Sequence, residues 1–119
     1  MSPPQLRTEH VGPVLVAHLT GEIDLSNVTT LRTRLYGAID DVDALVIDLT
    51  DTGYVDSTGV RLLFEMAERF NRAGQPVRAV VPEEALVRRV LTLTKLDRVV
   101  ELHETVDSAL ASLGDADGT

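Results

Sequence analysis

The 119-residue sequence contains no cysteine and no tryptophan, and aromatic residues make up only 3% of it. Without cysteine there is neither a disulfide framework nor a thiolate metal site, and a reducing compartment suits the chain. With so few aromatic side chains, the core must consist mainly of Leu, Val, Ile and Ala. Hydrophobic residues still reach 44%, so length and composition predict a single globular domain.

Positive charge is also scarce. Lys and Arg number 11 against 19 Asp and Glu, which gives a net charge of −8. An acidic chain is repelled by phosphate backbones and anionic lipids, so nucleic acid and membrane surfaces are poor partners. No apolar run approaches the roughly 20 residues that a membrane span needs, and residues 1–4 lack the features of a signal peptide. We therefore expect a cytoplasmic protein.

Strand and helix patterns alternate between residues 5 and 113, whereas the short ends of the chain have the composition of flexible tails, at 1–4 and 114–119. Short apolar segments predict strands at 5–11, 14–19, 44–49, 77–81 and 98–102. One-sided apolar stripes predict helices that begin near residues 27, 57, 82 and 105. Loops are expected at 20–24 and 50–56. This order predicts one α/β domain with a mostly parallel sheet of about four or five strands, an antiparallel N-terminal hairpin and about four amphipathic helices.

Neither metal binding nor nucleotide hydrolysis has a motif in this sequence. The three histidines, His10, His18 and His103, have no ligand partner three or four residues away, and we interpret them as surface or strand-edge residues. The one lysine, Lys95, does not follow a glycine-rich phosphate loop. We expect no cofactor.

The segment 56–59, Asp-Ser-Thr-Gly, follows an expected strand and opens an expected helix. The simplest role for Ser57 is to cap that helix with its side-chain oxygen. A serine hydrolase is a second interpretation, but Val55 replaces the glycine of a nucleophile elbow, and His103 is the only histidine that follows. In a third, Ser57 accepts a phosphoryl group, because a helix N-terminus offers free N–H groups and a partial positive charge. The residues alone leave these interpretations open.

Three segments in order resemble the anti-sigma factor antagonists of the STAS family. The main one joins Leu-Val-Ile-Asp-Leu at 45–49 to Val-Asp-Ser-Thr-Gly-Val at 55–60. Thr-Gly-Glu-Ile-Asp at 20–24 looks like the family's upstream motif, and residues 90–97 are similar to the helix that closes these domains. The resemblance covers the chain from about residue 5 to residue 113 and implies a single STAS-like domain.

The resemblance implies a function as well. Such proteins bind an anti-sigma factor that is also a serine kinase, and the sigma factor is thereby free to join RNA polymerase, so we expect a role in transcription regulation during a stress response. The kinase, with its own ATP and magnesium, would phosphorylate Ser57, and the phosphorylated antagonist would release the kinase. A serine/threonine phosphatase would then remove the phosphate and restore the binding form. The chain would then be a binding protein rather than an enzyme, a monomer or weak dimer without a cofactor.

The same resemblance assigns partner-binding residues. Asp56 matches the aspartate beside the acceptor, and Thr58 matches a position taken by Ser or Thr. Gly59 matches a glycine that lets helix and partner approach closely. Asp24 matches the acidic residue of the upstream loop, which faces the acceptor and the partner.

Arg61 departs from the family pattern, in which a small residue is common. A large cation near the start of the helix would alter partner choice, and it would also pair with a phosphate on Ser57. It mildly favours an alternative in which the domain is an unphosphorylated STAS scaffold or a sensor of a small ligand. We also expect buried side chains in the stripes and strands, at Leu31, Leu35, Val46, Ile47, Leu63 and Val80.

Overall fold

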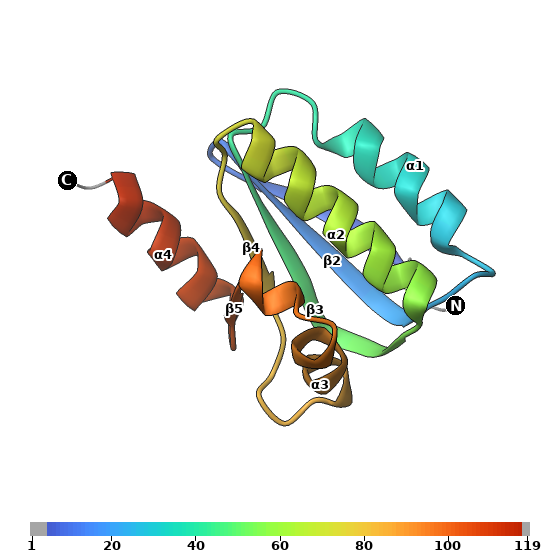
Figure 1. Cartoon of the computed structure of the whole chain (residues 1–119). Helices are drawn as coiled ribbons and strands as arrows, with labels where there is room; N and C mark the ends of the chain where they lie inside the picture. The colour runs from blue at the N-terminus through green and yellow to red at the C-terminus, as the bar shows by residue number, and fades with distance from the viewer. Residues whose placement is uncertain (1–4, 118–119) are drawn as a thin grey trace.

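The computed structural model describes residues 5–117. The expected N-terminal tail at 1–4 and the last two residues of the expected C-terminal tail, 118–119, therefore lie outside the described residues. A five-stranded sheet has the order β1-β2-β3-β4-β5 (Figure 1). Only the first pair of strands is antiparallel. The strands are β1 (Leu6–Val11), β2 (Val14–Ile23), β3 (Ala44–Val55), β4 (Val77–Val80) and β5 (Glu101–His103). The predicted α/β class and mostly parallel sheet are confirmed.

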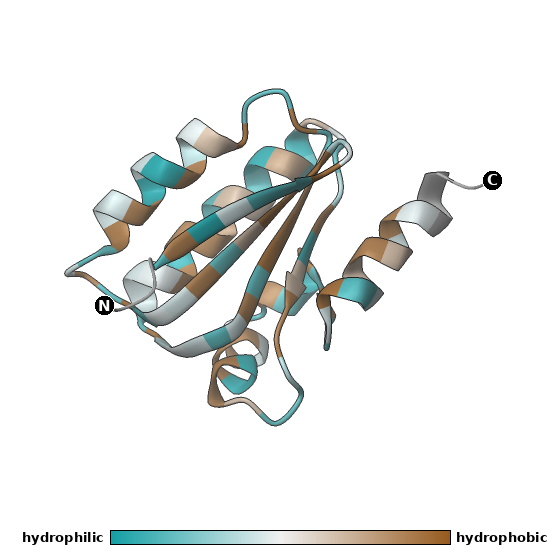
Figure 2. Ribbon diagram, turned by 180° about the vertical axis from the view of Figure 1, so that it is seen from behind, coloured by the Kyte–Doolittle hydropathy of each residue, from teal (hydrophilic) through white to brown (hydrophobic). Residues whose placement is uncertain are grey.

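Helices cover both faces of the sheet. They are α1 (Val28–Ala38), α2 (Ser57–Arg72), α3 (Leu86–Leu93) and α4 (Val106–Asp117), with a 3₁₀ turn η1 (Leu96–Arg98) after α3. The main core lies between one face of the sheet and α1, α2 and α3, and a smaller core lies under α4 on the other face. Because both faces are covered there, residues 44–49 of β3 are buried without interruption. Figure 2 shows hydrophobic stretches interrupted by hydrophilic ones along the strands.

The apolar stripe of α2 shows why this segment is helical. Its buried residues recur at helical spacing and face the sheet, among them Leu63, Ala67 and Phe70. The helix ends where Gly74 adopts a φ of 70°, which glycine accepts without strain. All six side chains that the sequence predicts to be buried are at most 2% exposed.

The loops expected at 20–24 and 50–56 are wrong, because β2 and β3 continue through them. The two strands remain paired in parallel as far as Ile23 and Val55. Two register shifts interrupt the pairing, and Gly21 lies between them with a φ of 79°. These strand ends are mostly polar and exposed, so they lack the apolar signal by which a strand is recognised.

Two further boundaries differ from expectation. Pro82 does not open the third helix; its carbonyl accepts a hydrogen bond from the N–H of Ala85 in a turn (3.1 Å), and α3 begins only at Leu86. The last strand begins at residue 101 rather than 98, because the 3₁₀ turn takes residues 96–98.

The final helix begins as expected and runs further. Thr105 caps it, since its hydroxyl oxygen accepts a hydrogen bond from the N–H of Ser108 (3.1 Å). The helix continues to Asp117, so residues 114–117, which we expected to belong to a tail, are helical. No helix within residues 5–117 is long and apolar enough to cross a membrane.

His18 is embedded in polar contacts on the face of the sheet opposite the main core. Its ring nitrogens lie 2.6 Å from Oδ2 of Asp48 and 2.7 Å from Oε1 of Glu9. The three side chains come from β2, β3 and β1, so they connect the first three strands. The expectation of a surface or edge histidine is wrong for His18, which is half-buried in an inner strand.

Candidate functional site

The end of β3 and the start of α2 lie beside the loop that follows β2. β4 pairs with β3 only as far as Asp48, so the second half of β3 pairs with β2 alone. Because β2 and β3 are parallel, both end at the same edge of the sheet, and the segments that follow them meet there (Figure 1).

Asp56, not Ser57, is the N-cap of α2. Its backbone is extended, with φ −88° and ψ −174°, and its Oδ1 accepts hydrogen bonds from the N–H groups of Thr58 (2.9 Å) and Gly59 (3.1 Å). Its Oδ2 accepts one from the N–H of Leu25 (3.2 Å), in the loop after β2. The expected capping by Ser57 is therefore wrong, because the preceding aspartate already satisfies these donors.

Ser57 is the first residue of α2 and is exposed. Within residues 5–117 its hydroxyl has no hydrogen-bond partner. Thr58 differs, since it is half-buried and its hydroxyl donates to Oδ1 of Asp56 (2.5 Å). Of the two adjacent hydroxyl groups, that of Ser57 is the more accessible to another protein.

The hydrogen bonds to Asp56 favour its charged form. The Thr58 hydroxyl first, and then the N–H groups of Gly59, Thr58 and Leu25, hold the pKa of this carboxyl below its ordinary value of 3.8. Because the pKa is lower in the folded state, the resulting stability is fully present above the ordinary value and is lost as the pH falls from there through the lowered pKa of the folded state.

An Asp56→Asn variant is therefore expected to be less stable than wild type at neutral pH. The difference in the free energy of unfolding should shrink as the pH falls below about 4, where the wild-type carboxylate loses this advantage. Urea denaturation of both proteins between about pH 7 and pH 3 measures it. A difference that stays constant over this range would contradict a role for the charge.

The Asp24 loop is organised by its own side chains. Oδ1 of Asp24 accepts hydrogen bonds from the N–H (2.9 Å) and the hydroxyl (2.5 Å) of Ser26. Asn27 precedes α1 but does not cap it with its side chain; its Oδ1 accepts from the N–H of Asp24 (3.0 Å). The structure thus brings the Asp24 loop against Asp56 through Leu25.

Gly59 lies at a close approach between α2 and the ends of β2 and β3. A Cβ atom at this position would lie 2.7 Å from Cγ1 of Val55 and 2.8 Å from Cγ2 of Ile23. The residue is buried, so in this structure the close approach is between elements of the fold. Val60 next to it is buried as well, and Phe64 is half-buried against the main core.

The sequence analysis missed two exposed apolar side chains at the site. Leu25 is 75% exposed and Tyr54 is 45% exposed. The N–H of Leu25 itself contacts Asp56, and Tyr54 lies two residues before Asp56, opposite Glu22 of β2. Large exposed apolar side chains often anchor protein partners. A leucine between Asp24 and Ser26 in a polar loop was the signal that could have identified the first of them.

Asp48 belongs to the strand motif but not to this site. It is buried on the opposite face of the sheet, where its carboxylate also accepts hydrogen bonds from the N–H (3.0 Å) and the hydroxyl (2.5 Å) of Thr50. Along an extended strand it lies roughly 20 Å from Val55. Its charge therefore adds little to the surface around Ser57.

The geometry does not assemble a hydrolase site on Ser57. His103 directs its two ring nitrogens to Ser108 Oγ (2.8 Å) and Glu101 Oε1 (2.6 Å), at the far edge of the sheet. Among residues 5–117, no histidine contacts Ser57. The same residues contain no group of three or more His, Asp or Glu side chains that could hold a metal ion.

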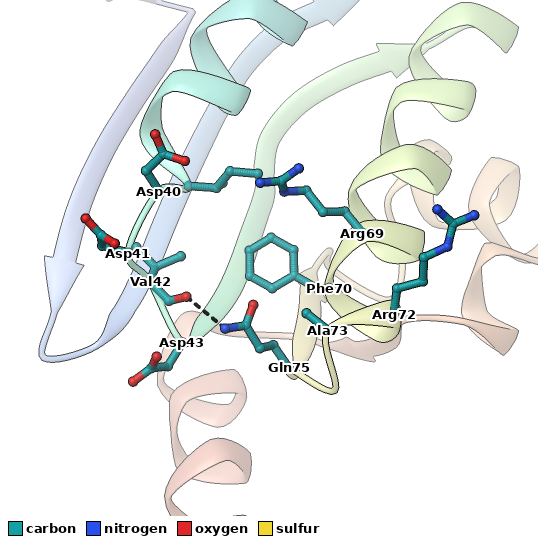
Figure 3. Close-up of a pocket in the computed structure, with 10 residues that line it drawn as sticks. Asp40, Asp41, Val42, Asp43, Arg69, Phe70, Arg72, Ala73 and Gln75 are labelled. Carbon is teal, nitrogen blue, oxygen red and sulfur yellow. Dashed lines mark hydrogen bonds between the residues drawn. The ribbon is translucent and has the colours of Figure 1, made fainter.

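A hollow of about 700 Å³ lies at the other end of α2 (Figure 3). Acidic residues after α1, among them Asp40 and Asp43, line one side of it, and Arg69 and Arg72 of α2 line the other. Along the helix axis it lies about 18 Å from Ser57. Arg72 is paired with Glu68, and the Arg69 guanidinium lies 5.5 Å from the centre of the Tyr36 ring, so both cations have partners within the fold.

Comparisons with known proteins agree with this geometry. The STAS domain family model matches residues 5–109. The anti-sigma-F factor antagonist RsfB of Mycobacterium tuberculosis is 33% identical over 107 residues, which cover 88% of this chain and 84% of RsfB.

Solved structures share the fold. The crystal structure of an anti-sigma factor antagonist from Mycobacterium paratuberculosis is 29% identical, with a TM-score of 0.83 over 94% of this chain and 97% of the other. The Bacillus cell fate determinant SpoIIAA, solved in its phosphorylated form, has a TM-score of 0.67 at 20% identity, over 91% of this chain and 98% of SpoIIAA. Since both the family model and the relatives span nearly the whole chain, this protein belongs to the STAS domain family, among the anti-sigma factor antagonists.

Proposed function

We propose that this protein binds an anti-sigma factor kinase and that phosphorylation of Ser57 ends the binding. The observation that carries the proposal is the placement of Ser57. Its hydroxyl is exposed at the start of α2, while neighbouring Asp56, Thr58 and Gly59 are held by the fold. The phosphorylated form of the structural relative SpoIIAA supports a switch of this kind.

The reaction would be a phosphoryl transfer carried out by the partner. The Oγ of Ser57 would form a bond to the γ-phosphorus of ATP as the bond to the ADP oxygen breaks, and a base of the kinase would take the hydroxyl proton. Hydrolysis of the phosphate ester by a serine/threonine phosphatase would return the hydroxyl and release inorganic phosphate. This chain would contribute an accessible acceptor in a fixed position.

The charge near Ser57 explains how phosphate would end the binding. Asp56 is adjacent, and Asp24 lies in the loop that contacts it through Leu25. A phosphate would add about −1.5 to −2 charges to this acidic surface. An interface that accommodates a neutral hydroxyl would then have to bury or approach a dianion, which is costly without a matching cation.

The proposal is tested by intact mass and peptide mapping of the protein isolated from its host during resting and stressed growth. One phosphoryl group on Ser57 is expected under at least one condition, and Ser57→Ala protein should retain the kinase in a pull-down with ATP present. An unmodified protein under both conditions, or a phosphate confined to Thr58, would contradict the proposal. The first result would favour the unphosphorylated scaffold or small-ligand sensor.

A further inference from the structure

A phosphate on Ser57 would find most of the donors of the helix N-terminus already in use. The N–H groups of Thr58 and Gly59 donate to the Asp56 carboxylate, and that of Val60 donates to the Asp56 carbonyl (2.9 Å). We expected free N–H groups at this point, and for these three donors the expectation is wrong. The phosphate would therefore need a cation from elsewhere.

Arg61 lies one helical turn after Ser57 and is exposed, like Ser57 itself. Residues four apart on a helix are neighbours, with Cβ atoms about 5–6 Å apart. An acidic group that precedes its basic partner by four residues has the more favourable orientation for an ion pair. The guanidinium of an arginine can also donate two parallel hydrogen bonds to a phosphate.

Arg61 has one other neighbour at this spacing, Glu65, but its carboxylate is already engaged. Arg32 of α1 donates from Nε to Oε2 (3.0 Å) and from a terminal nitrogen to Oε1 (3.1 Å) of Glu65. Within residues 5–117, Arg61 takes part in no ion pair. The Arg32–Glu65 pair thus leaves the Arg61 guanidinium available on the side of α2 that carries Ser57.

We propose that Arg61 binds the phosphate of phosphorylated Ser57 and so holds it on the surface of α2. This inference rests on the proposed function, because it takes Ser57 as the modified residue. The ion pair would stabilise the dianionic phosphate on the released antagonist. It would also withdraw Arg61 from any contact that it makes with the partner, so that one modification alters two side chains at the interface.

The test uses full-length protein in which phosphoserine is incorporated at position 57 during synthesis, so that no kinase is needed. The ³¹P resonance of the phosphate, followed against pH, reports the pKa of its second ionisation. In Arg61→Ala this pKa is expected to be roughly 0.15 to 0.4 units higher than in wild type, because the dianion has lost its cation. Arg61→Lys should recover part of the shift.

Two further variants distinguish the effect of a local ion pair on the phosphate pKa from the effect of a change in net charge. Arg34→Ala removes the same charge from an exposed position on α1 and should leave the titration unchanged. Arg32→Ala frees Glu65 to compete for Arg61, so it should raise the phosphate pKa in the direction of Arg61→Ala. Circular dichroism of each variant verifies that α2 is folded.

Identical titrations for wild type and Arg61→Ala, with both proteins folded, would overturn the inference. So would a shift of equal size in Arg34→Ala, since that would indicate net charge rather than a pair. Failure of the proposed function would be seen separately, because it would leave Ser57 unmodified in the host while the ³¹P titration of the synthetic phosphoprotein still reported on Arg61.

Discussion

Replacing Ser57 with Asp is expected to weaken binding of the anti-sigma factor by at least tenfold. A tenfold loss of affinity corresponds to about 1.4 kcal/mol, which one charge at an interface can supply. The new carboxylate would stand at an exposed position beside Asp56 and near the Asp24 loop, where negative charge is already concentrated. Since Ser57 does not cap α2, the substitution leaves the helix start intact and the effect should appear in binding rather than in folding.

Isothermal titration calorimetry with the purified anti-sigma factor measures the loss. Ser57→Ala should bind like wild type, because the neutral interface is preserved. Ala111→Asp provides a matched control, since it adds the same charge at an exposed position of α4, on the opposite face of the sheet. Equal affinities for Ser57→Asp and Ser57→Ala would show that charge at this position does not control the complex.

Replacing Gly59 with Ala is expected to destabilise the protein by about 1–3 kcal/mol, the usual cost of overpacking. The added methyl group would lie 2.7 Å from Val55 Cγ1, 2.8 Å from Ile23 Cγ2 and 3.1 Å from the Ile23 carbonyl oxygen. The two side chains can move aside at modest cost, but the carbonyl belongs to the strand that supports the site. The start of α2 should therefore move away from the sheet and carry Ser57 with it.

Gly37 is the matched control for this substitution. It lies within α1, and a Cβ atom there would meet nothing within 4 Å. Gly37→Ala should consequently stabilise the protein by about 0.4–1 kcal/mol, because alanine is the better helix residue. Thermal unfolding of both variants decides the matter, and a rise in melting temperature for Gly59→Ala would contradict the steric argument.

The sequence predicted the order and class of the elements because buried positions carry apolar residues at the regular spacing of a helix or in the short runs of a strand. The stripe from Val60 to Phe70 and the apolar run at 44–49 face the core, and both were recognised as helix and strand. The second halves of β2 and β3 have no such apolar pattern, since they pair with each other while most of their side chains face solvent. Strand pairing between distant segments is a tertiary property, and the polar composition of 20–22 and 50–54 resembles that of a loop.

The site was predicted in position but not in detail. The motif located Ser57 and its neighbours at the start of a helix, yet Asp, Ser and Thr are all good capping residues, so the sequence does not decide which of Asp56, Ser57 and Thr58 caps the helix. That choice follows from the extended backbone of Asp56. Nor does the sequence show that the carboxylate of Glu65 is engaged by Arg32, because that pair joins two helices 33 residues apart.

Ser57 stands free while the residues beside it are engaged, and this arrangement has a consequence for timing. Under the proposed switch, a kinase or phosphatase would reach the hydroxyl without waiting for the helix to open, so local unfolding would limit neither reaction. The interval between a signal and the response would then be set by the amounts and turnover of the two enzymes. Substitutions in the core can change how long the protein lasts in the cell without changing how quickly it responds.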